Sequence, residues 1–135
     1  LMHLTNAREI NSFVLSTDSL LKNGVFSMTY ELRTYIIPQG KMDDILNRFK
    51  NVTMRLFKKH EMEVVGFWTI SKTGKKNTLI YLMRFVDEEA MNKAWSAFRS
   101  DEEWITTREK TEANGPIVEE VKSELLTPTS FSSLQ

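Results

Sequence analysis

The spacing of hydrophobic side chains divides the chain into segments that favour strands and segments that favour helices. Residues 28–37 read Met-Thr-Tyr-Glu-Leu-Arg-Thr-Tyr-Ile-Ile, a β-branched and aromatic run that predicts a strand ending at Pro38 and Gly40. From residue 42 the hydrophobic positions recur at steps of three and four, which predicts an amphipathic helix ending near His60. The predicted buried stripe of this helix is Met42, Ile45, Leu46, Phe49, Val52, Leu56 and His60.

The second half of the chain repeats this change of spacing. Residues 63–71 and 78–86 predict two strands, joined by a hairpin loop at 72–77 in which Gly74 can take a positive φ. Asp87 is placed to cap a following helix. The predicted buried stripe of that helix is Ala90, Met91, Ala94, Trp95 and Phe98.

A further short helix and a last strand follow. Ser100 and Glu103 fit a capping box for a helix through Trp104. Residues 114–116, Asn-Gly-Pro, end this helix, and residues 117–126 predict the final strand. The order β-α-β-β-α-β, with one extra helical turn, predicts an α+β fold of the ferredoxin-like type with a four-stranded antiparallel sheet.

The strand at 78–86 is hydrophobic on both faces. One face carries Leu79, Tyr81, Met83 and Phe85, and the other carries Ile80, Leu82 and Val86 beside the polar Arg84. Two helices can cover only one face of such a sheet, and a face left in water is normally polar. We therefore expect a second copy of the chain to cover the other face, giving a homodimeric α/β barrel with a ligand pocket at the uncovered side. The alternative is that the N-terminal arm covers this face within one chain.

Residues 1–26 differ from the rest, so we divide the chain into an N-terminal tail or short helical arm and a domain at 27–135. Asn6 with Glu9 could cap a short helix, and Gly24 could end a second one. A loose tail or cloning remnant and an arm that packs on a partner subunit both remain open. The segment does not resemble a secretory signal, and Glu9 and Asp18 disfavour a cleaved organelle presequence.

Composition narrows the classes of function. The 135 residues include 18 basic and 18 acidic side chains, and the formal net charge of zero disfavours capture of nucleic acid or of an anionic membrane. There is no cysteine, which excludes disulfides and cysteine-ligated metals, and the two histidines, His3 and His60, are too few for a histidine metal motif. No hydrophobic run approaches the roughly 20 residues that span a bilayer. We therefore expect no metal, no cofactor, no nucleic-acid partner and no membrane span.

Five segments, taken in order, resemble the NIPSNAP family. They are residues 30–35 (Tyr-Glu-Leu-Arg-Thr-Tyr) with Gly40 and Lys41; His60 followed by residues 66–68 (Gly-Phe-Trp); Gly74 with Asn77; Asp101 with Trp104; and residues 128–132 (Pro-Thr-Ser-Phe-Ser). Two positions depart from the family pattern. Glu61 stands where glycine commonly follows the histidine, and Glu102 replaces the proline of an Asp-Pro-x-Trp element. These two departures put the local backbone conformation at residues 61 and 102 in doubt, but not the fold.

The resemblance implies a ferredoxin-like domain that forms dimeric α/β barrels and has no settled catalytic mechanism. Animal members commonly carry two such domains and are linked with mitochondria and vesicle traffic, whereas bacterial members are single-domain proteins of undefined function. This chain carries one copy, so it is more similar to the single-domain kind. A cytoplasmic location is expected, or a mitochondrial one in a eukaryote.

Arg33 and Tyr35 are the first candidates for a ligand site. They share one face of the first predicted strand with Glu31. A buried arginine must be paired, so one interpretation is an internal charge network with Glu31 or with the neighbours of Arg84. The other is that Arg33 holds an anionic ligand group while Tyr35 donates a hydrogen bond.

The remaining candidates are His60, Trp68, Asn77 and Trp104. His60 is either a helix-terminal or core histidine or, as the one imidazole of the domain, the candidate catalytic base. Trp68 shares a strand face with Gly66 and is either a core residue or a pocket wall. Asn77 either satisfies the loop backbone or faces the pocket, and Trp104 either anchors the short helix or lines the pocket rim.

Two functions follow from these candidates. The first is a dimeric module that binds a small apolar or anionic molecule or a protein partner. The alternative is a cofactor-independent monooxygenase or isomerase, in which His60 is the base while Arg33 and Tyr35 hold an activated substrate in a dry pocket.

Overall fold

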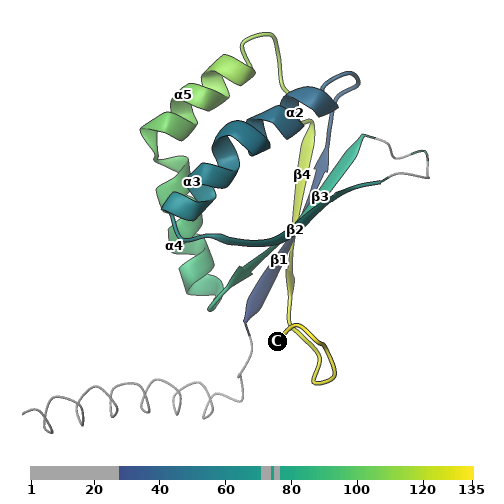
Figure 1. The fold of residues 1–135 in the computed structure, drawn as a ribbon, viewed down its shortest axis with the longest axis vertical. Helices are drawn as coiled ribbons and strands as arrows, with labels where there is room; N and C mark the ends of the chain where they lie inside the picture. Colours follow the sequence, from purple (N-terminus) through teal and green to yellow (C-terminus); the bar gives the residue numbers. More distant parts are fainter. Residues whose placement is uncertain (1–27, 71–73, 75–76) are drawn as a thin grey trace, which may run out of the picture.

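Four antiparallel strands form one sheet, and the helices lie together on one side of it (Figure 1). This computed structural model describes residues 28–70, 74 and 77–135. The predictions for residues 1–26, and for most of the loop at 72–77, therefore lie outside the described residues. The strand order is β2-β3-β1-β4. The predicted α+β fold with a four-stranded antiparallel sheet is confirmed.

The elements follow the predicted order, including the further helix predicted before the last strand. They are β1 (Thr29–Ile36), α2 (Met42–Arg48), the π-helical segment η1 (Phe49–Thr53), α3 (Met54–Lys59), β2 (Glu63–Thr69), β3 (Thr78–Phe85), α4 (Glu88–Arg99), α5 (Glu102–Thr111) and β4 (Glu120–Leu126).

Helix caps and turns explain several of these boundaries. The Asp87 side chain accepts a hydrogen bond from the Ala90 amide at 2.7 Å, so the predicted cap of α4 is confirmed. The predicted cap of α5 is wrong, because Asp101 rather than Ser100 is the N-cap, and its carboxylate accepts from the Glu103 amide at 2.9 Å. Helix α5 continues to Thr111 and ends shortly before residues 114–116, which were predicted to end it.

The last strand and the glycines also differ from the prediction. β4 begins at Glu120 instead of residue 117, and Ile117 is buried in the core ahead of the strand. Positive φ angles occur at Gly40 (+80°), after β1, and at Gly115 (+111°), after α5.

The predicted helix at 42–60 contains an unpredicted π-helical turn. α2, η1 and α3 follow one another without a break, and the wider turn of η1 shifts the buried face. Thr53 in this turn and Phe57 after it are buried, and so is Arg48 at the end of α2, although none of the three belongs to the predicted stripe. Val52 of that stripe is only partly buried.

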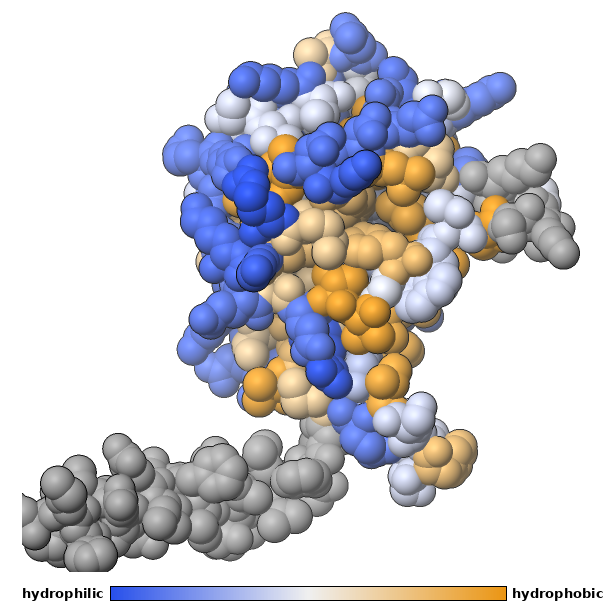
Figure 2. Space-filling model, in the orientation of Figure 1, coloured by the Kyte–Doolittle hydropathy of each residue, from blue (hydrophilic) through white to orange (hydrophobic). Residues whose placement is uncertain are grey.

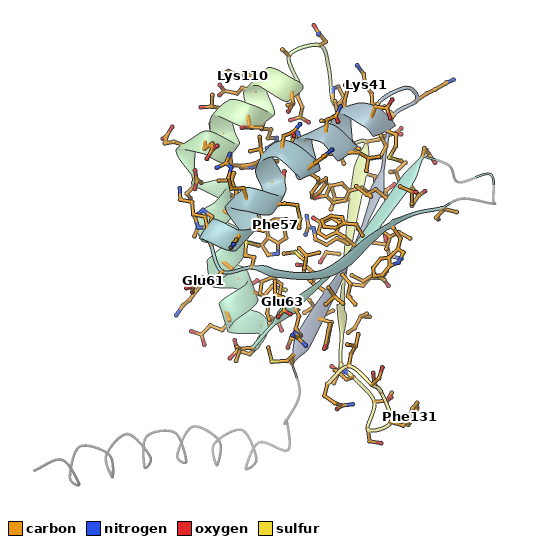
Figure 3. All side chains as sticks on the ribbon, in the orientation of Figure 1. Lys41, Phe57, Glu61, Glu63, Lys110 and Phe131 are labelled. Atoms are coloured by element: carbon orange, nitrogen blue, oxygen red, sulfur yellow. The ribbon has the colours of Figure 1, made fainter. Side chains whose placement is uncertain are left out.

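Alternation along the strands separates two faces of the sheet. On β3 the side chains at 79, 81, 83 and 85 are buried against the helices, as predicted. Ile80 and Leu82 are half-buried on the opposite face, and Val86 just beyond the strand is exposed. The helix side holds the core, which is rich in aromatic rings, and Phe57 lies among the side chains between helices and sheet (Figure 3). Neither a helix nor a strand of the described residues covers this second face, but the C-terminal segment reaches one end of it, where the buried Tyr30 donates its hydroxyl to the Gln135 carbonyl at 3.1 Å.

The described residues were also compared with the expectations for membrane spans and metal sites. None of the helices in the described ranges is long and apolar enough to cross a membrane. Over the same ranges, no three histidine, aspartate or glutamate side chains are grouped closely enough to hold a metal ion.

Candidate functional site

A cavity of about 260 Å³ lies between the helices and the β1–β4 side of the sheet. The residues that line it include Arg33 and Tyr35 from β1, Arg48 and Thr53 at the two ends of η1, Trp95 from α4 and Trp104 from α5. The sequence-based expectation placed the pocket at the uncovered face. The cavity instead lies on the helix side, because Arg33 and Tyr35 alternate along β1 with the side chains of the open face and so point toward the helices. One chain supplies all the side chains named here.

Arg33 and two tyrosines form a polar network on the cavity floor. The register of the sheet places Arg33 opposite Tyr81 of β3, and Arg33 Nε donates a hydrogen bond to Tyr81 Oη at 2.7 Å. Tyr35 Oη lies 2.8 Å from Tyr81 Oη and accepts a longer contact, 3.4 Å, from Arg33 Nη2. The two hydroxyls and the guanidinium therefore fix one another in place.

Glu31 is the counterion of this network. Its carboxylate accepts hydrogen bonds from Arg33 Nη1 at 2.9 Å, from Trp95 Nε1 at 2.7 Å and from Ser123 Oγ at 2.6 Å. The predicted Glu31–Arg33 charge pair is confirmed, and three donors satisfy a carboxylate that is almost fully buried. The alternative partner set near Arg84 is wrong, because Arg84 pairs with Glu63 on the other face of the sheet.

The network also shifts the protonation behaviour of its members. Burial alone would lower the pKa of Arg33, but the oxygens of Tyr81, Tyr35 and Glu31 outweigh it and hold the pKa above its ordinary value. Burial raises the pKa of Tyr81, as does the neighbouring Tyr35, against the opposing effect of Arg33. Arg33 is therefore a permanent cation, and Tyr81 remains a protonated hydroxyl at neutral pH.

Aromatic rings form the walls above this floor. The Arg33 guanidinium carbon lies 4.3 Å from the centroid of the Trp95 ring, a cation–π contact. Phe57 packs edge-on against Trp95 with centroids 5.7 Å apart, and Phe98 lies 4.8 Å from Trp104. The arrangement can accommodate a flat apolar body above a rigid set of hydrogen-bond donors.

The structure brings Arg33, Tyr35 and Trp104 together and places the other predicted site residues elsewhere. His60 caps the end of α3, where its Nε2 lies 2.7 Å from Asp101 Oδ2, and it does not line the cavity. Asn77 is exposed, and its carbonyl oxygen accepts a bond from the Ile37 amide at 2.8 Å, so it holds the hairpin to the end of β1.

Trp68 lies on the uncovered face of the sheet. Its side chain is half exposed, and the ring folds over Gly66, where an added Cβ would come within 2.8 Å of the ring. The predicted shared face of Trp68 and Gly66 is confirmed. The sheet separates this indole from Arg33, so the two residues cannot contact one small ligand within a single chain.

Sequence reasoning did not assign Tyr81, Trp95 and Arg48 to the site. Tyr81 and Trp95 were read only as buried positions of a strand and a helix. A buried tyrosine and tryptophan both need a partner for their polar atom, and that requirement was the available signal. Arg48 gave no signal, because an arginine off the predicted hydrophobic stripe is normally solvated, whereas this one is buried at the end of α2, one turn after Ile45.

One protein-family model matches most of the described residues. The model of the NIPSNAP family matches residues 30–133. Among curated proteins, mouse protein NipSnap homolog 3B is 30% identical over 82 residues, and human protein NipSnap homolog 3A is 29% identical over 83 residues. Each alignment covers 61% of this chain but only 31% of the mammalian protein.

Solved structures share the fold at low sequence identity. A NIPSNAP family protein of unknown function from Agrobacterium tumefaciens has a TM-score of 0.71 and 22% identity, over 81% of this chain and 95% of that one. SnoaB, a cofactor-independent oxygenase from Streptomyces nogalater, has a TM-score of 0.53 and 11% identity, over 79% of this chain and 98% of that one. Both likenesses concern the fold.

Proposed function

The chain belongs to the NIPSNAP family, and on that premise we propose that it binds a small, partly apolar molecule with a polar or anionic group. The observation that carries this proposal is the floor of the cavity, where Arg33, Tyr35 and Tyr81 are held in one rigid network under aromatic walls. Preorganised donors lose little conformational entropy when a ligand binds. The NIPSNAP family has no defined activity, so the support for this proposal comes from the geometry of the cavity.

The donor count of Arg33 supports a ligand contact at this floor. A guanidinium has five N–H groups, and the contacts within the described residues occupy three of them. Arg33 also lines the cavity, so its remaining donors have a ligand space to face. Because Glu31 already neutralises Arg33, a neutral carbonyl or hydroxyl oxygen fits this position as well as an anion does.

Retention of a ligand by the protein tests this proposal. Native mass spectrometry and equilibrium dialysis against pooled metabolites should recover a retained molecule from the wild type. Arg33→Gln should weaken its binding about tenfold, since a hydrogen bond from a charged group contributes about 1.5–3 kcal/mol. Arg55→Gln is the matched control, because Arg55 forms an exposed ion pair with Glu103 away from the cavity. Unchanged binding in Arg33→Gln would reject the role of the floor.

We further propose that the protein works as a homodimer in which a second copy covers the open sheet face. The side chains on that face include half-buried Leu32, Ile80 and Leu82 at the centre, with Trp68 at 53% exposure and Val86 at 56%. Figure 2 shows hydrophobic surface gathered beside the hydrophilic surface of the helices. A contiguous apolar face of this kind marks an interaction surface in soluble proteins.

Sedimentation equilibrium at micromolar concentration tests the dimer. Leu82 pairs with Leu32 at the centre of the open face, so Leu82→Lys should convert a wild-type dimer to a monomer. Lys122→Gln on the same face of the edge strand should leave the dimer intact. A wild-type monomer at these concentrations would refute the covering of this face by a second copy.

The alternative function is a cofactor-independent monooxygenase or isomerase. Its support is the fold shared with SnoaB and the aromatic cavity. Its difficulty is the base: His60 lies outside the cavity beside Asp101, and Tyr81 is held protonated. If turnover of any accepted substrate is found, His60→Ala should leave it unchanged. A loss of turnover without a loss of folding would restore the histidine as the base.

A further inference from the structure

The two ends of the π-helical segment form a second polar site of the cavity. Arg48 precedes η1 and Thr53 is its last residue, and both line the cavity. The Met54 amide donates to the carbonyl of Phe49, five residues earlier, which is the π-helical pattern. Side chains five apart therefore lie close to one side of this turn, whereas in an α-helix they diverge by about 140°. The π-helix thus directs Arg48 and Thr53 to the same wall.

Both side chains carry buried polar atoms without a partner. The Arg48 side chain is 6% exposed and its Nη1 donates to Thr111 Oγ1 at 3.1 Å, but its Nε has no partner among the described residues. The buried Thr53 hydroxyl has none among them either. Buried donors are nearly always hydrogen-bonded, because an unpaired donor keeps its full cost of desolvation. Neither atom is open to the cavity as the side chains stand, so an acceptor reaches these donors only when the two side chains turn toward the cavity that their residues line.

The charge of Arg48 is also incompletely balanced. Its nearest carboxylate is Glu112, at 4.0 Å from Nη1, and that carboxylate is shared with Arg108 Nε at 2.9 Å. Burial lowers the pKa of Arg48, and Glu112 opposes only part of that effect. Arg33 on the floor has a carboxylate of its own at 2.9 Å. The Trp104 ring, 4.9 Å from the Arg48 guanidinium carbon, adds a weak cation–π contact.

We propose that Arg48 and Thr53 bind the carboxylate of the ligand, so that the ligands are flat, largely apolar monocarboxylic acids. An anion supplies hydrogen-bond acceptors for the unpaired donors of Arg48 and Thr53. It also supplies the negative charge opposite Arg48 that Glu112 provides only in part. The Arg33–Tyr35 floor then contacts an uncharged oxygen or the flat body of the ligand. This inference rests on the proposed ligand-binding function, and it names the chemical class and the residues that select it.

Two isosteric probes test the assignment. The probes are 2-naphthoate and 2-naphthamide, which share a flat body and differ in the charge of the end group, and isothermal titration calorimetry measures their affinities. The wild type should bind the acid about tenfold or more tightly than the amide. Arg48→Gln should abolish that preference while leaving the affinity for the amide within about twofold. Arg55→Gln, on the solvent side of the same helix, should change neither affinity.

Each result has one meaning for the inference. Equal binding of acid and amide to the wild type would overturn the carboxylate site and leave the ligand-binding function standing. Binding of neither probe to the wild type would count against the proposed function and, with it, this inference. If Arg48→Gln does not fold, Arg48→Lys replaces it: the planar fork is lost, and the preference should fall at least about threefold. A preference retained at full strength in either folded variant would overturn the assignment.

Discussion

Replacement of Glu61 by glycine should stabilise the protein, because Glu61 occupies a backbone conformation that favours glycine. Its φ is +56°, and it is the one non-glycine residue in the described ranges with a positive φ. It follows the cap residue His60, and the Met62 amide donates to the Phe57 carbonyl at 2.8 Å while the Glu61 amide donates to the Lys58 carbonyl at 3.1 Å. This pair of bonds is a Schellman motif, which requires a left-handed residue at Glu61.

The size of the effect follows from two opposing terms. A side chain in the left-handed region costs roughly 1–2 kcal/mol. Glycine removes that strain but gains about 0.5–1 kcal/mol of conformational freedom in the unfolded chain. Glu61 is exposed at the turn after α3 and forms no ion pair with another described residue, so its carboxylate offers little to lose (Figure 3). The net gain should be about 0.5–1 kcal/mol, or a rise in Tm of roughly 2–5 °C for a domain of this size.

The assay needs a control that separates backbone strain from charge. A carboxylate at the C-terminal end of a helix is unfavourable, so any neutral residue at 61 removes some repulsion. Glu61→Ala removes the charge but keeps the strain, and it should gain much less than Glu61→Gly. Tm is measured by circular dichroism at one protein concentration, because association would make it concentration-dependent. Equal gains in the two variants, or no gain with glycine, would refute the reasoning from φ.

Three further predictions concern other parts of the fold. The basic partners of Asp101, Lys59 foremost, hold the pKa of its carboxyl below the ordinary range. The carboxylate therefore stabilises the fold above about pH 4, and this stabilisation is lost on further acidification. Asp101→Asn should make the free energy of unfolding depend less steeply on pH below about pH 5. Gly66→Ala pushes a Cβ to within 2.8 Å of the Trp68 ring and should cost about 1 kcal/mol in urea denaturation, a cost that disappears in a Trp68→Ala background. Tyr35→Phe removes a hydroxyl from the buried network and should cost about 1 kcal/mol in the same assay; no loss would mean that water replaces it.

Local chemistry made much of the fold predictable from the sequence. Strand alternation has a period of two, so the faces of β1 and β3 followed once each strand was recognised. Arg33 and Tyr35 could be placed on one face for this reason, and Glu31 could be named as the neighbour of Arg33. The side chain of Asp87 likewise marked the start of α4. These inferences needed only contacts within one element.

The rest of the site depended on contacts between elements. Tyr81 meets Arg33 because β1 and β3 pair in one particular register, and Trp95 reaches Glu31 from a helix 64 residues away in the chain. Arg48 was the largest obstacle, because a charged residue off the hydrophobic stripe was grouped with the solvated lysines and arginines, although it is buried at the end of α2. The π-helical turn that follows was a second obstacle, because it breaks the regular period of 3.6.

His60 shows why a chemical signal in the sequence did not identify a catalytic role. It is the one imidazole of the domain, but it ends α3, and the N-cap of α5 lies directly against that end. Its Nε2 lies 2.7 Å from Asp101, which also accepts from Lys59 at 2.8 Å, so the histidine joins two helices. The resemblance to the family could indicate that the residue matters, but only the packing of the helices shows what it contacts.

Separation of the two sheet faces has a consequence for the function. Arg33 and Leu82 lie on adjacent strands but point to opposite sides, so the ligand cavity and the proposed dimer face share a backbone and no named side chain. The sequence had tied the pocket to the second copy, because both were placed at the uncovered side. With the cavity built from one chain, loss of the dimer need not remove the ligand site. Any effect of dimerisation on binding would have to pass through the shared strands, which makes the affinity of a Leu82→Lys monomer the direct measure of that coupling.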